Sequence, residues 1–471
     1  MLKKLSIDFI LYGIGGSLSK LSSLLLLPFF TSYFTPEEYG ILELLTVLIT
    51  LFSIVCLLQL ESSLSRFFYE FEEETRGQMI TTLFVFVGIL SFLVMTLLLF
   101  LSKPINLLLF DTLDYKSGYL LAVLSLPFFC WNALLIVLIR FMGQTSLFIK
   151  SQFVGFLISL ILPIILVVKY NQGIESFFWG QGCSLFIVVF FLMYSLRTVF
   201  SVKINVRHLL PALQYSVPLI PGVASGWINS YGSRFVMISF LSFREIGIYA
   251  AAIKIASIFQ LIGSAFRMTW PQFFWKTFKE DKNHKIIFRN LHSIFSLGVT
   301  LVLIFFCFYI SDGIQVFLGE EYLQATPLIP LIAFSFLIQS FLTQIIGVGP
   351  SIVQKTKYNS YAFILGTGVN LSLLFILIPR FDLFAVPICF FMGTFTTYIS
   401  LWMFTEKLYP LHFSIKNGLI HSSIALAAIY CASQYKNNFL VKTILCVGFS
   451  LILIFTTKEF LEIIKNKRKR K

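Results

Sequence analysis

Residues 79–101 read MITTLFVFVGILSFLVMTLLLFL, a stretch without a single charged side chain. A helix needs about 20 apolar residues to cross about 30 Å of hydrocarbon, and inside a bilayer it satisfies its own backbone hydrogen bonds. The rest of the chain is similar, because 57% of its 471 residues are hydrophobic and only 12% are charged. This composition excludes a water-soluble protein and predicts an all-α polytopic membrane protein.

Fourteen stretches of this kind fill the chain. They lie near residues 5–30, 40–62, 79–101, 118–140, 151–169, 176–196, 215–240, 245–266, 291–311, 325–346, 359–379, 384–404, 414–433 and 440–457. The first contains Asp8 and Lys20, so it lacks the uninterrupted apolar core of a cleavable signal peptide. We therefore expect it to remain as a helix.

The distribution of lysine and arginine predicts the orientation, because short loops rich in these residues stay in the cytoplasm. With both termini inside, 26 of the 36 basic residues fall in inside segments, 7 in outside loops and 3 within spans. The formal charge of +14 is mostly this topological signal. No basic soluble domain is present to bind nucleic acid, and the basic tail at residues 465–471 is expected to lie against anionic membrane lipids.

A short repeat predicts the domain organisation. Residues 34–41, FTPEEYGI, resemble residues 241–248, LSFREIGI, at an offset of 207. Six spans lie between corresponding points, so both copies have the same orientation, which predicts two six-helix bundles related by an axis along the membrane normal. The predicted parts are residues 1–205, residues 206–408, and residues 409–471 with two additional helices and the basic tail.

Three basic residues lie deep within the predicted spans: Lys20, Arg234 and Lys254. Each would cost about 2.5 to 3.5 kcal/mol facing lipid, so we expect them to face protein or a water-filled cavity. Each shares a helix face with glycine, serine or alanine residues. Such small residues also mark simple helix packing, with the cation bound to a backbone carbonyl. The alternative is a basic cavity that binds an anionic ligand.

Four motifs then resemble a known family. They are Tyr12-Gly13 through Lys20 to Pro28, the turn Thr35-Pro36-Glu37-Glu38-Tyr39-Gly40, Arg66-Phe67-Phe68-Tyr69, and Gly247-Ile248-Tyr249-Ala250. Together they resemble the polysaccharide exporters of the multidrug/oligosaccharidyl-lipid/polysaccharide (MOP) superfamily, especially O-antigen flippases of the Wzx type. The resemblance covers about residues 5–405 and implies a MATE-like transporter of two related bundles.

The resemblance implies a flippase in the bacterial cytoplasmic membrane that is not an enzyme. Its substrate would be an undecaprenyl-diphosphate-linked oligosaccharide, destined for O-antigen, capsule or a related glycan, and its partners a glycan polymerase and chain-length machinery. The cationic cavity residues of the family carry over as a pattern onto Lys20, Arg234 and Lys254, which would bind the diphosphate. Asp8, Glu43 and Glu61 are possible coupling acids or ion-pair partners.

Two other functions remain open. A drug or cation antiporter of the same superfamily would call for intramembrane acids, whereas this interior is basic. An integral-membrane polymerase or glycosyltransferase would normally need a large outside loop or a paired-carboxylate motif, and every predicted outside loop is short. The scattered cysteines and histidines show no metal-ligand spacing, so we expect no metal and no cofactor.

Overall fold

The structure is a computed structural model, and it describes residues 21–456 except 69, 71, 354, 356 and 436–438. This described part is helical throughout, without a β-strand, and helices cover each of the predicted spans from residue 21 on. Among the described residues, eight helical segments are long and apolar enough to cross a membrane, or nine when a pair of helices bent by 40° is counted as one span. The all-α membrane fold is therefore confirmed, and the helices are consistent with fourteen spans.

The chain forms two compact units. The first takes in the chain up to Trp227 and returns for Ser242–Gly247, and the second takes in Ile228–Leu241 and everything from Ile248 on.

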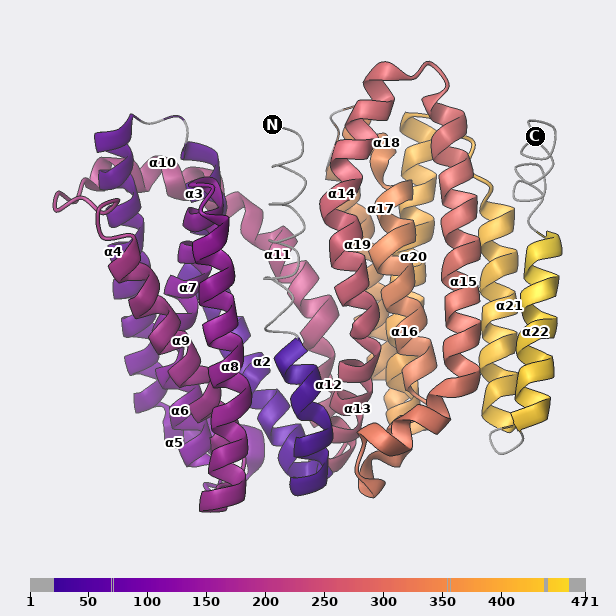
Figure 1. Cartoon of the computed structure of the whole chain (residues 1–471), viewed down its shortest axis with the longest axis horizontal. Helices are drawn as coiled ribbons and strands as arrows, with labels where there is room; N and C mark the ends of the chain where they lie inside the picture. Colours follow the sequence, from indigo (N-terminus) through magenta and orange to yellow (C-terminus); the bar gives the residue numbers. More distant parts are fainter. Residues whose placement is uncertain are drawn as a thin grey trace. The chain divides into compact units, whose positions relative to one another are not determined.

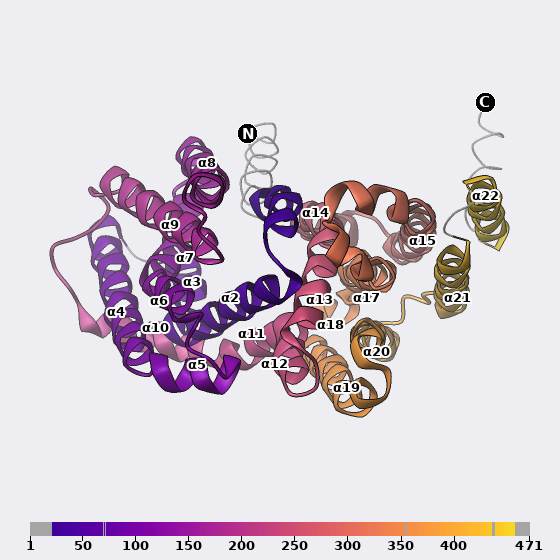
Figure 2. The same cartoon turned by 90° about the horizontal axis from the view of Figure 1, so that it is seen from below.

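The helices of the first unit follow a short helix, Leu21–Tyr33. They are α2 (Pro36–Leu57), α3 (Leu60–Phe67), α4 (Glu73–Phe100), α5 (Ser102–Phe110), α6 (Lys116–Leu124), α7 (Leu126–Phe141), α8 (Thr145–Tyr170), α9 (Glu175–Ser195), α10 (Leu209–Ser216) and α11 (Ile220–Trp227). Both Figure 1 and Figure 2 show α4, α7, α8 and α9 running alongside one another as a bundle.

The second unit begins with a π-helical turn, η3 (Ile228–Gly232), and contains a second one, η5 (Ile338–Leu342). Its helices are α12 (Ser233–Ile238), α13 (Phe243–Ala256), α14 (Ile258–Glu280), α15 (His284–Phe317), α16 (Ile329–Leu337), α17 (Thr343–Ile346), α18 (Val348–Ile352), α19 (Lys357–Phe381), α20 (Ala385–Leu408), α21 (Ile415–Gln434) and α22 (Phe439–Thr456). In this unit α16 contacts both α14 and α15. Helices α21 and α22 contact each other and α15, and both lie on the same side of α15 (Figures 1 and 2).

The two copies of the sequence repeat adopt the same local structure. Thr35 and Glu38 form a capping box at the start of α2, in which each side chain bonds the backbone of the other. Ser242 and Glu245 form the same reciprocal pair at the start of α13. A capping box satisfies amide groups that have no partner in the first helical turn. The shared glutamate of the repeat is therefore a helix-start signal.

The glycines of the repeat pack against each other within the first unit. A Cβ atom on Gly40 would lie 2.1 Å from the carbonyl oxygen of Phe243, and one on Gly247 would lie 1.7 Å from that of Pro36. No real Cβ atom fits at these distances, so the starts of α2 and α13 can touch only because both positions are glycine. The shared isoleucines, Ile41 and Ile248, are fully buried.

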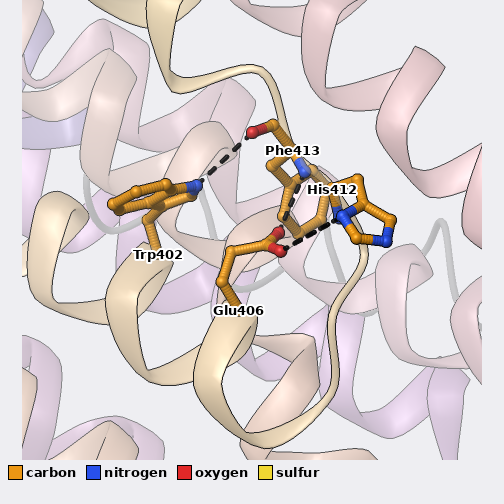
Figure 3. Close-up of polar contacts among 4 residues, drawn as sticks. All are labelled: Trp402, Glu406, His412 and Phe413. Carbon is orange, nitrogen blue, oxygen red and sulfur yellow. Dashed lines mark hydrogen bonds and ion pairs between the residues drawn. The ribbon is translucent and has the colours of Figure 1, made fainter.

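A carboxylate near the end of α20 holds the loop between α20 and α21 through hydrogen bonds. Glu406 accepts hydrogen bonds from the backbone amides of His412 and Phe413, at 3.1 and 2.9 Å, while Trp402 donates to the carbonyl of Phe413 at 3.4 Å (Figure 3). His412 adopts a left-handed backbone conformation with φ 56°. The chain is thereby turned sharply and leads into α21.

Polar contacts join α21 and α22 to α15. Ser296 and His421 are hydrogen-bonded at 2.8 Å, and Tyr309 and Thr443 at 3.1 Å. Lys442 pairs with Asp312 at 2.7 Å, and only 3% of the Lys442 side chain is exposed against 53% of the Asp312 side chain. The 7 basic residues assigned to outside loops from the sequence include Lys442, which is instead a buried residue of α22.

The unequal exposure of this ion pair predicts unequal costs of breaking it. Asp312→Asn removes the carboxylate that pairs with the buried Lys442 ammonium, which should destabilise the protein by about 3 kcal/mol or more. Lys442→Met leaves a carboxylate that water can solvate, so the expected cost is about 1 kcal/mol or less. Thermal unfolding of the two purified variants measures this difference. Equal losses in Tm would contradict the unequal costs, and no loss in either variant would show that the pair does not stabilise the packing of α22 on α15.

Candidate functional site

Arg234 is the largest side chain that is almost completely buried, with 1% exposure. It lies on α12, directly after the π-helical turn η3. Its Nη1 atom donates to the carbonyl of Ser230 in that turn, and its guanidinium group lies 5.3 Å from the ring centre of Tyr231 and 5.9 Å from that of Tyr249. Aromatic faces attract a desolvated cation. The rings of Tyr231 and Tyr249 therefore lie close to the positive charge of Arg234, which the sequence predicts within the span 215–240.

Lys254 lies in the last turn of α13, where the path of the chain bends. Helix α13 ends at Ala256, α14 begins at Ile258, and the two axes differ by 40°. The Ser257 hydroxyl donates to the Lys254 carbonyl at 2.6 Å, which satisfies an oxygen near the break. Lys254 itself is partly exposed and, within the described residues, forms no ion pair with an acid.

Arg267 is a third cation of the second unit, and the sequence analysis did not single it out. It lies one residue past the predicted span that ends at residue 266, on α14, which continues without a break to Glu280. The Nη1 atom of Arg267 donates to the hydroxyl of Ser340 at 3.2 Å. No carboxylate of the described chain pairs with Arg267. Spacing could have found it, because Arg267 follows Ser264 by three residues and continues the small-residue stripe of Lys254.

A close helix contact positions this arginine. A Cβ atom on Gly263 would lie 2.2 Å from the Cβ of Ser340, so α14 approaches the π-helical turn η5 closely at this point. Arg267 lies one turn further along α14 and bonds the same serine. Thus each of the two π-helical turns in the described part of the second unit provides a hydrogen-bond acceptor for an arginine, and such turns are frequent at functional sites. Of these two arginines, Arg234 is buried and Arg267 is partly exposed.

Of the other predicted site residues, Lys20 and Asp8 lie outside the described residues. Glu43 is buried on α2 with 5% exposure. Glu61 lies on α3, where its Oε1 atom accepts from Gln59 at 3.1 Å and its Oε2 atom is buried without a hydrogen bond in the described structure. Both glutamates belong to the first unit, whereas Arg234, Lys254 and Arg267 belong to the second.

The electrostatic character of the second unit is therefore basic. Lys254 and Arg267 lack carboxylate partners among the described residues, and for Lys254, which lies within a predicted span, a charge near the centre of a bilayer would cost about 2.5 to 3.5 kcal/mol on insertion scales. The described residues also contain no cluster of histidine, cysteine, aspartate and glutamate that could hold a metal ion. Cations without a carboxylate partner in or next to a span suit an anionic ligand.

Solved structures with the same fold are membrane transporters. The lipid II flippase MurJ in an inward closed conformation aligns with a TM-score of 0.77 over 97% of this chain and 100% of the other, at 15% identity. An inward-facing multidrug resistance MATE transporter aligns with a TM-score of 0.68 over 87% and 98% of the two chains, at 13% identity. The chain therefore has the fold of the MOP transporters.

Sequence comparison identifies the family. Residues 33–327 match the family described as polysaccharide biosynthesis protein, and the chain belongs to that family. A protein of the Lsg locus of Haemophilus influenzae is 24% identical over 292 residues, which cover 60% of this chain and 69% of the relative. The resemblance seen in the sequence motifs is thus confirmed at the level of the family and the fold.

Proposed function

We propose that this protein is a flippase that moves an undecaprenyl-diphosphate-linked oligosaccharide across the bacterial cytoplasmic membrane by alternating access. The observation that carries the proposal is that two cations, Lys254 within a predicted span and Arg267 one residue past it, have no carboxylate partner among the described residues of a polysaccharide biosynthesis protein. Membership of the family supports a glycan substrate, and the fold supports a transporter. A diphosphate would provide the negative counter-charge that the two cations do not have within the described protein.

The chemistry of the cations suits a diphosphate. Charge-assisted hydrogen bonds to phosphate oxygens are roughly twice as strong as neutral ones, and a guanidinium group can bind two oxygens at once. Lys254 and Arg267 make the first contacts in this proposal, together with Lys20. Arg234 joins them when Tyr231, which is 36% exposed, moves away from its guanidinium group.

The glycan is proposed to serve O-antigen, capsule or a related surface polysaccharide. A glycan polymerase and chain-length machinery would then act on the product at the outer face. Both termini are placed in the cytoplasm, since that orientation puts 26 of the 36 basic residues inside. Membrane lipids surround the helices in either orientation.

Among the three candidate coupling acids, Glu61 fits a proton-binding role best. Its Oε2 atom is buried and has no hydrogen bond in the described structure. An ionised carboxylate in that setting is disfavoured, and gaining a proton removes the cost. Asp8 and Glu43 are retained as ion-pair candidates.

The experiment that tests the proposed function is transbilayer movement of a lipid-linked oligosaccharide by purified protein in liposomes. Movement that requires the protein supports a flippase. Movement of cationic drugs without movement of the lipid-linked glycan would assign the chain to the antiporters instead.

A further inference from the structure

The second unit contains an open hollow of about 320 Å³ between α14, α15 and the π-helical turn η5. Phe259, Val299 and Leu337 form its buried floor, with 3 to 5% exposure, while Ile262 and Val302 are about half exposed at its rim. Every residue of its wall is apolar or glycine. Ligand sites start at about this volume, and an apolar wall within a membrane span suits a hydrocarbon chain.

A cation lies beside this hollow. Phe266 packs on Phe295 and Phe341, two rings of the wall, with centroid distances of 4.9 and 5.1 Å. The next residue, Arg267, bonds Ser340, which lies between the wall residues Leu337 and Phe341. The contact of Arg267 with Ser340 therefore joins α14 and η5, two of the elements that line the hollow.

The apolar and charged residues follow one another along α14 in the same order as the apolar chain and the anionic head group of an amphiphilic lipid. Ile262 of the rim precedes Arg267 by five residues, which is about 7.5 Å along a helix axis. The helix then continues to the exposed Lys276, next to its polar end at Glu280. An apolar chain in the hollow would place its anionic head at Arg267, between the hydrocarbon region and the polar end of the helix.

We propose that the hollow binds the first isoprene units of the lipid carrier while Arg267 binds its phosphate, an inference that rests on the proposed function. A methyl-branched isoprenoid is wider than a straight acyl chain and fills a broad hollow with aromatic walls more completely. Burial of apolar surface contributes roughly 25 cal/mol per Å². The tail is then held by the protein during recognition of the substrate.

Gly298 offers a direct test, because it lines the hollow and a Cβ atom there would meet nothing within 4 Å. Gly298→Phe should fill the hollow without disturbing the packing of α15. Gly368→Phe on α19 is the matched control, since this glycine also has open space around it and lies away from the hollow. Ile262→Trp narrows the hollow from its rim and provides a second, independent variant.

The measurement is photolabelling of purified protein by a diphosphate that carries a photoreactive isoprenoid chain, followed by mapping of the labelled peptides. Wild-type protein and Gly368→Phe should be labelled on α14, α15 or η5, and labelling should fall roughly tenfold in Gly298→Phe and Ile262→Trp. A straight-chain alkyl diphosphate of equal carbon number is the comparison probe, and it should label the same peptides weakly.

Undiminished isoprenoid labelling in both filled variants would overturn the inference. Equal labelling of the hollow by the straight-chain probe would also overturn it, because the hollow would then be a general lipid site. Transport by the wild-type protein separates this inference from the proposed function. If wild-type protein moves the lipid-linked glycan and filling the hollow changes nothing, the tail site is wrong and the flippase stands.

Discussion

Replacing Lys254 or Arg267 with glutamine is expected to abolish transport of the lipid-linked glycan while the protein remains folded in the membrane. Each side chain loses the charge that holds a phosphate, and a hydrogen bond to a charged group contributes about 1.5 to 3 kcal/mol. That corresponds to a loss of binding of roughly tenfold or more for each residue. The exchanges Arg267→Lys and Lys254→Arg keep the charge and should preserve part of the activity.

Stability distinguishes a binding role from a structural one. Neither cation has a carboxylate partner among the described residues, so removing its charge should leave Tm unchanged or raise it. Arg234→Gln should lower both transport and Tm, because it also removes the contacts with Tyr231 and Tyr249. Lys276→Gln on α14 is the control, since Lys276 is 73% exposed and should affect neither quantity.

Transport and Tm of the purified variants decide between these roles. The same loss is expected for Lys20→Gln if Lys20 binds the diphosphate as the sequence predicts. Wild-type transport by at least two of the four neutral variants at Lys20, Arg234, Lys254 and Arg267 would contradict the cationic binding site.

Replacing Gly40 or Gly247 with alanine is expected to remove most of the folded protein. The new methyl group would meet a backbone carbonyl at 2.1 Å in Gly40→Ala and at 1.7 Å in Gly247→Ala. Overpacking typically costs about 1 to 3 kcal/mol where side chains can move aside. Here the obstacle is backbone, so the starts of α2 and α13 must separate and the expected loss is larger.

Gly226→Ala is the control for this pair of variants, because a Cβ atom at Gly226 would meet nothing within 4 Å. The amount of monodisperse protein extracted from membranes, and its Tm, measure the effect. If Gly40→Ala and Gly247→Ala are recovered as stable as Gly226→Ala, the glycine contact does not constrain the fold.

The class of fold and the existence of the repeat could be read from the sequence. Long apolar stretches predict membrane helices regardless of tertiary contacts, because the bilayer imposes the same requirement on each of them. The motif around Gly40 and Gly247 was visible as a repeat. Its physical cause, two capping boxes and a backbone contact, appears only when both helix starts are placed together.

The residues of the candidate site could be predicted from the sequence only in part. Arg267 lies one residue past the predicted end of its span at residue 266, so a search for cations deep within the spans did not single it out. Lys442 was misplaced because a lysine near the predicted end of a span resembles a loop residue until its partner Asp312 is known. The π-helical turns depend on tertiary packing and leave no periodic signal in the sequence.

The most direct measurement of the central claim uses liposomes that carry a labelled undecaprenyl-diphosphate-linked oligosaccharide in both leaflets, with a membrane-impermeant reagent added outside. Wild-type protein should expose the inner-leaflet lipid to the reagent, so that nearly all of the label reacts. Liposomes with the Lys254→Gln variant, or without protein, should keep the inner-leaflet label protected. If wild-type protein at the same density leaves the inner-leaflet label as protected as protein-free liposomes do, this chain is not a flippase for lipid-linked glycans.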